Sequence, residues 1–185
     1  MKDTVVLQGK KELDIYMNPQ RQNLIRCMKI EGEPLTPKQL SVKLGISASS
    51  VQHHLKKLAE LGLVEVSYTR QIKGITASYY SLLPKTVAIG GELKDENFNQ
   101  RLVIMQNALS SAFDGFARYS SAAAGLQEGR QHGDVLSGVV HLSNKEAKEL
   151  YALVRTFLEE HETKKKGCIP WEYSMVFYPA GEEDA

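Results

Sequence analysis

The sequence has few cysteines and no long apolar run. Its 185 residues include two cysteines, Cys27 and Cys168, which stand far apart and form neither a metal-spaced pair nor a disulfide framework. No apolar stretch approaches the roughly 20 residues needed to cross a bilayer, and the N-terminus lacks a secretory apolar region. These absences predict a cytoplasmic protein with no membrane partner. The composition is otherwise that of a globular chain, long enough for one full domain or two small ones.

The sequence also lacks the motifs that mark common catalytic sites. It contains no nucleophile elbow, phosphate-binding loop, dinucleotide fingerprint or zinc-protease helix. His132, His141 and His161 are scattered, with no carboxylate or cysteine at ligand spacing to them. We therefore expect no enzyme activity, no cofactor and no metal site.

The net charge of +1 conceals an uneven distribution along the chain. Residues 1–90 contain 13 Lys and Arg against 7 Asp and Glu, whereas residues 91–185 contain 10 against 15. A basic half joined to an acidic half indicates a polyanion-binding module with a second module attached. Chance clustering is the alternative explanation.

Start and stop signals predict three short helices in the basic half. An Asn-Pro pair at 18–19 is typical of an N-cap followed by proline at the first helical position, and it predicts a helix over about 19–31. The capping box Thr-Pro-Lys-Gln at 36–39 opens a short helix that stops at Gly45. Ser47 then caps a third helix, which runs to about residue 61. A short helix, a glycine turn and a second helix make a helix-turn-helix, whose second helix enters the DNA major groove.

The adjacent histidines of the third helix are expected to have different roles. At about 100° of rotation per residue, Val51, Leu55 and Leu58 share one face and belong in the core. His53 lies on the opposite, outward face. His54 lies at the edge of the buried face, where its ring packs and a nitrogen binds a backbone or phosphate group. Adjacent helical side chains diverge, so a metal pair is not expected.

The pattern changes to period two after Gly62. Residues 63–68 and 77–83 predict two strands joined by a basic tip at 69–74, which is a β-hairpin wing placed after the recognition helix. The alternative is a solvated hairpin tip with no DNA contact. The residues expected to contact DNA lie at the start of the helix that opens at 36–39, on the recognition helix and on the wing. They are Thr36, Lys38, Ser47, Ser49, Ser50, Gln52, His53, Lys56, Lys57, Arg70 and Lys73.

Residues 18–83 resemble the ArsR-type winged helix-turn-helix of bacterial transcription regulators. The resemblance is carried by the NPQR opening at 18–21, the LGIS turn at 44–47, the SVQHHLKKL core at 50–58 and the GLV entry to the wing at 62–64. It implies a dimer whose recognition helices read two half-sites about one duplex turn apart. Metal-sensing members carry a cysteine-containing cluster in the helix before the turn. Here Ser-Val-Lys at 41–43 occupies that region, which argues against this form of metal sensing.

Residues 84–92 are expected to end the wing and form a linker, after which a long helix is predicted over about 95–122. Apolar residues recur there from Phe98 to Phe116, with Ala112 among them, at spacings of 4, 3, 4, 3 and 4, which is a heptad seam. The seam either forms a dimer interface or packs within its own domain. Its candidate dimerisation residues are Phe98, Leu102, Met105, Leu109 and Phe116.

The rest of the acidic half is expected to be α+β. Residues 123–134 predict a loop, 138–142 a short strand, and the capping box at 143–146 opens a periodic helix. A last strand is predicted over 169–178. This order is similar to the region that follows the wing in many ArsR-like regulators. The aromatic side chains are candidates for an effector pocket, or alternatively for core or dimer interface: Tyr151, Trp171, Tyr173 and Phe177.

The predicted fold is therefore α+β, with a winged helix-turn-helix over residues 1–90 and a helix-rich α+β dimerisation or effector-sensing domain over residues 91–185. The predicted function is sequence-specific binding of double-stranded DNA by a homodimeric transcription regulator. Its recognition helix, 47–61, would lie in the major groove and its wing, 63–83, on the backbone or minor groove, and a small-molecule effector is a further candidate partner. The alternative is a winged-helix module for protein interaction or architecture, without sequence-specific DNA reading.

Overall fold

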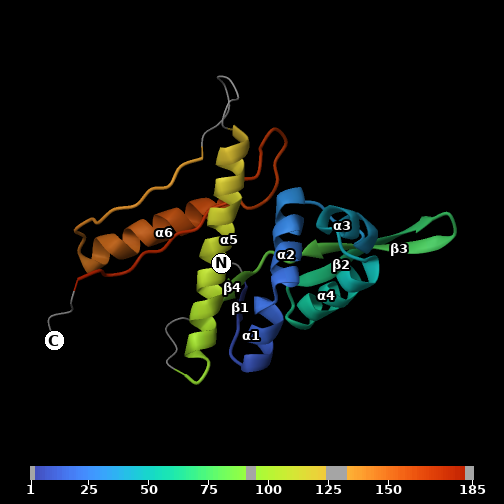
Figure 1. The fold of residues 1–185 in the computed structure, drawn as a ribbon, viewed down its shortest axis with the longest axis horizontal. Helices are drawn as coiled ribbons and strands as arrows, with labels where there is room; N and C mark the ends of the chain where they lie inside the picture. Colours follow the sequence, from blue (N-terminus) through green and yellow to red (C-terminus); the bar gives the residue numbers. More distant parts are fainter. Residues whose placement is uncertain (1–2, 91–94, 124–132, 182–185) are drawn as a thin grey trace. The chain divides into compact units, whose positions relative to one another are not determined.

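The computed structural model describes residues 3–90, 95–123 and 133–181 (Figure 1). The chain divides into two compact units, residues 1–105 and 106–185, each of which is described by itself. None of the helices in the described residues has both the length and the apolar character needed to cross a lipid bilayer.

Among its described residues, the first unit contains four complete helices and two small sheets. The helices are α1 (Lys10–Met17), α2 (Pro19–Glu31), α3 (Pro37–Leu44) and α4 (Ala48–Glu60). An antiparallel hairpin pairs β2 (Val64–Ile72) with β3 (Ile75–Leu82), and a parallel pair joins β1 (Thr4–Val6) to β4 (Thr86–Ala88). The helix α5 (Phe98–Ala123) begins in this unit and continues into the second.

Local capping explains where the predicted helices begin and end. The Asn18 side chain accepts hydrogen bonds from the backbone N–H groups of Gln20 and Arg21, at 3.1 and 3.3 Å, which opens α2. Thr36 and Gln39 form the reciprocal capping box of α3. Gly45 ends α3 in the left-handed conformation, with φ of 65°, which glycine adopts without steric cost. The three helices predicted in this region are confirmed.

The wing is confirmed as a hairpin, but its tip is shorter than predicted, because residues 69–72 of the expected tip pair with β3 as part of β2. Lys73 and Gly74 both have positive φ, 50° and 81°, as a two-residue turn between twisted strands requires. A register shift between Val66 and Tyr68 marks an irregularity in β2. At the base of the hairpin, Leu35 and Tyr80 exchange two backbone hydrogen bonds of 2.9 Å each. The wing is therefore attached to the loop that enters α3.

Two apolar clusters hold the first unit together. The larger one joins α2, α3, α4 and the hairpin through the buried residues Leu24, Met28, Leu35, Leu40, Val51, Leu55, Leu58, Leu63 and Val64. Val51, Leu55 and Leu58 are at most 1% exposed, which confirms the predicted inward face of α4. The smaller cluster contains Leu7, Leu13 and Ile104, the last of these from α5.

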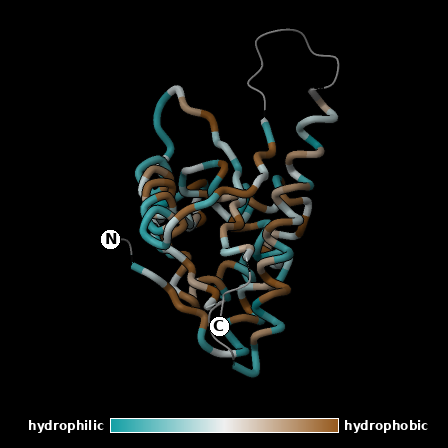
Figure 2. The backbone as a smooth tube through the Cα atoms, turned by 90° about the vertical axis from the view of Figure 1, so that its left-hand side faces the viewer, coloured by the Kyte–Doolittle hydropathy of each residue, from teal (hydrophilic) through white to brown (hydrophobic). Residues whose placement is uncertain are grey.

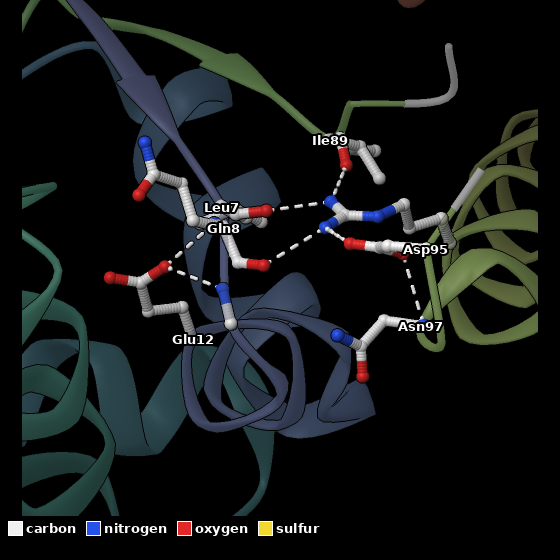
Figure 3. Close-up of polar contacts among 8 residues, drawn as sticks. Leu7, Gln8, Glu12, Ile89, Asp95 and Asn97 are labelled. Atoms are coloured by element: carbon white, nitrogen blue, oxygen red, sulfur yellow. Dashed lines mark hydrogen bonds and ion pairs between the residues drawn. The ribbon is translucent and has the colours of Figure 1, made fainter. Parts of the chain in front are cut away.

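The start of α5 is fixed by a buried arginine. Arg101 is fully buried, and its guanidinium donates hydrogen bonds to the backbone oxygens of Leu7 (2.6 Å), Gln8 (3.0 Å) and Ile89 (Figure 3). It also pairs with a carboxylate oxygen of Asp95 at 3.0 Å. These bonds connect α5 to β1 and to the segment that follows β4. The segment 84–92, expected to be a linker, thus includes the strand β4 at 86–88.

The second unit contains the rest of α5 and the helix α6 (Asn144–Glu160). Ser143 caps α6, since its Oγ accepts a hydrogen bond from the backbone N–H of Glu146 and the Glu146 carboxylate accepts one from the backbone N–H of Ser143. The predicted capping box is confirmed. In Figure 2, hydrophobic positions recur along α5, the helix that ends where the long grey trace begins. Most of the loop predicted over 123–134 lies outside the described residues.

The two strands predicted in the second unit are not formed. Residues 138–142 and 169–178 are extended, yet within the described residues neither belongs to a strand or a β-bridge. A strand needs a neighbour for its backbone N–H and C=O groups, and in this chain the two segments do not pair with each other. Every described residue from 106 to 181 is at least partly exposed to solvent.

Candidate nucleic-acid interface

The outward face of α4 is polar. Ser49, Gln52, His53 and Lys56 are exposed there, opposite the buried face of the helix. Among these residues the side chains offer hydroxyl, amide, imidazole and ammonium groups, which are the groups that bond to base edges and phosphates. The structure therefore places four of the predicted DNA-contacting residues together on one surface.

Serines organise the first turn of α4. The Ser47 Oγ accepts a hydrogen bond of 3.1 Å from the backbone N–H of Ser50, so Ser47 is the N-cap of the helix. The hydroxyls of Ser47 and Ser49 lie 3.0 Å apart and share a hydrogen bond. Ser50 is half-buried. Of these three predicted contact residues, Ser47 caps the helix. Ser49 is exposed, whereas Ser50 is not fully so.

The two lysines at the end of α4 differ in their surroundings. Lys57 is half-buried and its Nζ lies 2.9 and 3.0 Å from the two carboxylate oxygens of Glu60. The hydrogen bond from Lys57 lowers the pKa of Glu60 below its usual value, which keeps the pair charged. Lys56 is exposed on the same face as Gln52 and His53. Lys56 is thus better placed than Lys57 to meet a phosphate.

His54 lies behind the polar face, as its predicted position requires. Its side chain is half-buried and its ring centroid is 5.6 Å from that of His53, in an edge-to-face arrangement. Its Nδ1 is buried and has no hydrogen-bond partner among the described residues, so the backbone or phosphate partner expected for a ring nitrogen of His54 stays a prediction. Burial, and then the positive charge of Arg21, lower the pKa of His54 below its ordinary value.

Thr36 and Lys38 lie at the start of α3. The Thr36 Oγ1 donates to the Gln39 side chain at 2.8 Å and accepts from the Gln39 backbone N–H at 3.2 Å. Thr36 is half-buried and acts as a cap, whereas Lys38 is exposed one residue inside the helix. A cation there is available to a phosphate that lies beside the first turn of α3.

The wing carries its two cations near its tip. Arg70 on β2 is exposed opposite Ala77, and Lys73 is exposed in the turn. Behind them, Tyr68 and Tyr79 stack across the strands with ring centroids 4.5 Å apart. A cross-strand aromatic pair of this kind stabilises a hairpin by up to about 1 kcal/mol. Both tyrosines lie in the segments predicted as strands, 63–68 and 77–83, but their stacking was not predicted.

A second basic surface was not predicted from the sequence. A shallow depression between α1 and α4 is lined by Lys10, Lys11, Asp14, Ile15, Arg21 and Lys57. Arg21 is committed to the fold, because its guanidinium donates to the backbone oxygens of Ile15 and, at 3.1 Å, Asp14. The adjacent residues Lys10 and Lys11 were the sequence feature that could have indicated this surface. Because the helix α1 was not predicted, the sequence did not show that they lie near α4.

The candidate dimerisation residues follow one another along α5. Phe98, Met105 and Phe116 are half-buried, whereas Leu102 and Leu109 are 45% and 39% exposed. The candidate effector-pocket residues are all exposed: Tyr151, Trp171, Tyr173 and Phe177. None of them lines the depression between α1 and α4. None lines a second depression in the first unit either, which is formed by Cys27 and its neighbours on α2 and α3. Within the described residues, no group of three or more His, Cys, Asp or Glu is arranged to hold a metal ion.

A short helix, a glycine turn, a second helix with a polar outward face and a β-hairpin define a winged helix-turn-helix, the class of DNA-binding domain found in transcription regulators. The family comparison agrees with this fold. Residues 16–67 match the family model described as a helix-turn-helix domain, and the resemblance of this segment to ArsR-type regulators is confirmed. No curated protein matches the chain in sequence.

Three solved structures show low overall similarity to the chain. A possible transcriptional regulator from Methanosarcina mazei Go1 is 18% identical, with a TM-score of 0.34, covering 57% of this chain and 81% of its own. The adhesin competence repressor AdcR from Streptococcus pyogenes is 15% identical, with a TM-score of 0.32 and coverage of 80% and 83%. The heme sensor protein PefR from Streptococcus agalactiae, in complex with heme, is 14% identical, with a TM-score of 0.30 and coverage of 82% and 80%.

Proposed function

We propose that this protein is a homodimeric transcription regulator that reads specific sequences in double-stranded DNA. The recognition helix, residues 47–61, enters the major groove, and the wing, 63–83, lies on the backbone or in the minor groove. The observation that carries this proposal is the orientation of α4, whose apolar face is buried while Gln52 and His53 project outward. A helix with this division of faces presents its polar groups to base edges.

Base reading is assigned to the exposed polar residues of α4. Gln52 bonds to adenine through its amide, and His53 and Ser49 complete the contacts to base edges. Lys38, Lys56, Arg70 and Lys73 are exposed and bind phosphates. Because phosphate binding releases counterions, the affinity falls steeply with salt.

Dimerisation is assigned to residues 91–185, with α5 as the main contact. The heptad residues Leu102 and Leu109 are exposed on α5, where a second copy would bury them. A two-fold dimer places two recognition helices on half-sites about one duplex turn apart. The aromatic residues of the second unit, Tyr151, Trp171, Tyr173 and Phe177, are retained as candidates for an effector pocket.

Selection of bound fragments from a random DNA pool tests this proposal. We expect enrichment of one sequence with two-fold symmetry, whose half-sites are separated by about one helical turn. A winged helix used only for protein interaction or architecture would enrich no sequence, which would contradict the proposal. The same selection repeated with cell extract tests for an effector, since an effector would change the enrichment or the yield.

A further inference from the structure

The second unit leaves an unusual amount of apolar side chain in solvent. Between residues 133 and 181 no described residue is buried, and Leu136, Val139, Trp171 and Tyr173 are 100%, 77%, 58% and 62% exposed. Folded single chains rarely expose large contiguous apolar surfaces unless another molecule covers them. The extended segments on either side of α6 thus require a partner.

The pattern of the last segment is that of a strand with one apolar face. Alternate residues from 169 to 177 are all apolar, namely Ile169, Trp171, Tyr173, Met175 and Phe177. Alternation of period two places these five side chains on one face of an extended chain. The helix α6 is amphipathic as well, with Leu150, Val154 and Phe157 on one side. A helix and strands with apolar faces bury them by packing in layers.

We propose that residues 135–142 and 169–178 are strands completed by a second copy of this chain, and the proposal rests on the homodimer proposed above. The segment 135–142 of one copy pairs with the segment 169–178 of the other, and the two-fold axis repeats the pair. The apolar face of α6 then packs on the resulting sheet.

A second copy suits this surface for two reasons. In Figure 1 the two segments, drawn in orange and red, run on opposite sides of α6, so the single chain does not bring them edge to edge. The segments are also nearly uncharged, since 135–142 has no Asp, Glu, Lys or Arg and 169–178 has only Glu172. Pairing between copies therefore brings no charge repulsion. A strongly charged partner would find no complementary charge on these strands.

The exposed aromatic side chains supply a large part of the area that a stable dimer buries. Trp171, Tyr173 and Phe177, which share the apolar face, are 58%, 62% and 41% exposed. Since a fully exposed aromatic side chain presents about 150–250 Å², these three residues alone offer roughly 240–400 Å². A standard interface buries about 800 Å² on each partner, so they account for about a third to a half of that area.

Hydrogen exchange of the full chain, followed by mass spectrometry at two concentrations, tests the pairing. Above the dimer dissociation constant we expect amides in 135–142 and 169–178 to exchange at least tenfold more slowly than unstructured peptide. Below that concentration both segments should lose protection together, while α2 and α4 keep theirs. Free exchange of both segments in a proven dimer would overturn the proposal, and so would equal protection in the monomer.

Proline substitutions test whether the backbone itself pairs. Successive N–H groups of a strand point to opposite edges, so one of Ser174→Pro and Met175→Pro must remove a ladder hydrogen bond. We expect at least one to raise the dimer dissociation constant tenfold or more over alanine at the same position, in sedimentation experiments. Equal dissociation constants for proline and alanine at both positions would contradict the pairing. The melting of the first unit shows whether each variant folds.

The two proposals fail in different ways. A dimer with protected segments that enriches no DNA sequence contradicts the proposed function and leaves the strand pairing intact. A DNA-reading dimer with unprotected segments contradicts the strand pairing alone. A protein that stays monomeric at all concentrations, also on its enriched DNA, contradicts both the homodimer and the pairing.

Discussion

The guanidinium of Arg101 donates a hydrogen bond of 2.6 Å to the backbone oxygen of Leu7, a residue 94 positions earlier in the chain. The same side chain binds the backbone oxygens of Gln8 and Ile89. One buried cation thus joins the N-terminal segment, the end of the wing region and the first turns of α5. The fold of the first unit depends on α5 for this reason.

Replacement of Arg101 by methionine should destabilise the first unit by about 3 kcal/mol, because it leaves buried backbone oxygens without donors. Urea unfolding followed by far-UV circular dichroism measures the change. Arg118 lies exposed on the same helix, so Arg118→Met is the matched control and should change the free energy of unfolding by less than about 0.5 kcal/mol. Equal effects of the two substitutions would refute the structural role given to Arg101.

Ser47→Ala should cost about 1 kcal/mol, because the N-cap hydrogen bond to the Ser50 backbone is lost. Ser47→Asp should retain most of that stability, since aspartate is a good N-cap and its charge favours a helix N-terminus. DNA affinity should follow the opposite order: Ser47→Asp should bind more weakly than Ser47→Ala, because its negative charge would face phosphates. Thermal melts and gel shifts of both variants separate the capping role from the contact role.

His53→Ala should relax the sequence preference at one base position, with a loss of about 1–3 kcal/mol in discrimination. Lys56→Ala should instead weaken binding to all sequences alike and reduce the slope of log affinity against log salt by about one. Lys57→Ala should change that slope less, because Glu60 already pairs with this lysine. Fluorescence anisotropy with the selected site and a scrambled site at several salt concentrations measures all three. Unchanged binding by both His53→Ala and Lys56→Ala would count against the assigned interface.

His54 should make the first unit less stable in mild acid. Burial lowers the pKa of His54 in the folded state below its ordinary value of 6.5, so the unfolded chain takes up the proton first as the pH falls. The contribution of His54 to stability is therefore complete above pH 6.5 and is lost as the pH falls from there to the folded-state pKa. The urea midpoint should fall between pH 7.5 and pH 5 in the unchanged protein, and this fall should be smaller in His54→Gln.

The elements that the sequence predicted correctly are those fixed by local chemistry. Asn18, Thr36, Ser47 and Ser143 each satisfy backbone N–H groups within three residues, so their helices are readable from short motifs. The inward face of α4 follows in the same way from the spacing of its leucines. The polar outward surface of the candidate site was therefore predictable before the fold was known.

The missed pairing of β1 with β4 depends on distant segments. Thr4 pairs with Thr86, 82 positions later in the chain. A strand of three residues is too short for its hydrophobic pattern to predict such a pairing. Conversely, residues 169–178 have a clear strand pattern and form no strand in the single chain. Alternation shows which side chains share a face, but it does not show which chain supplies the neighbouring strand.

The paired backbone bonds between Leu35 and Tyr80 have a mechanical consequence. Because they join the foot of the hairpin to the entrance of α3, a tilt of the hairpin would also move the start of α3, and α4 with it through the shared apolar cluster. In the proposed complex with DNA, the spacing between wing contacts and helix contacts would therefore depend on this one connection, and a substitution there would change both sets of contacts together.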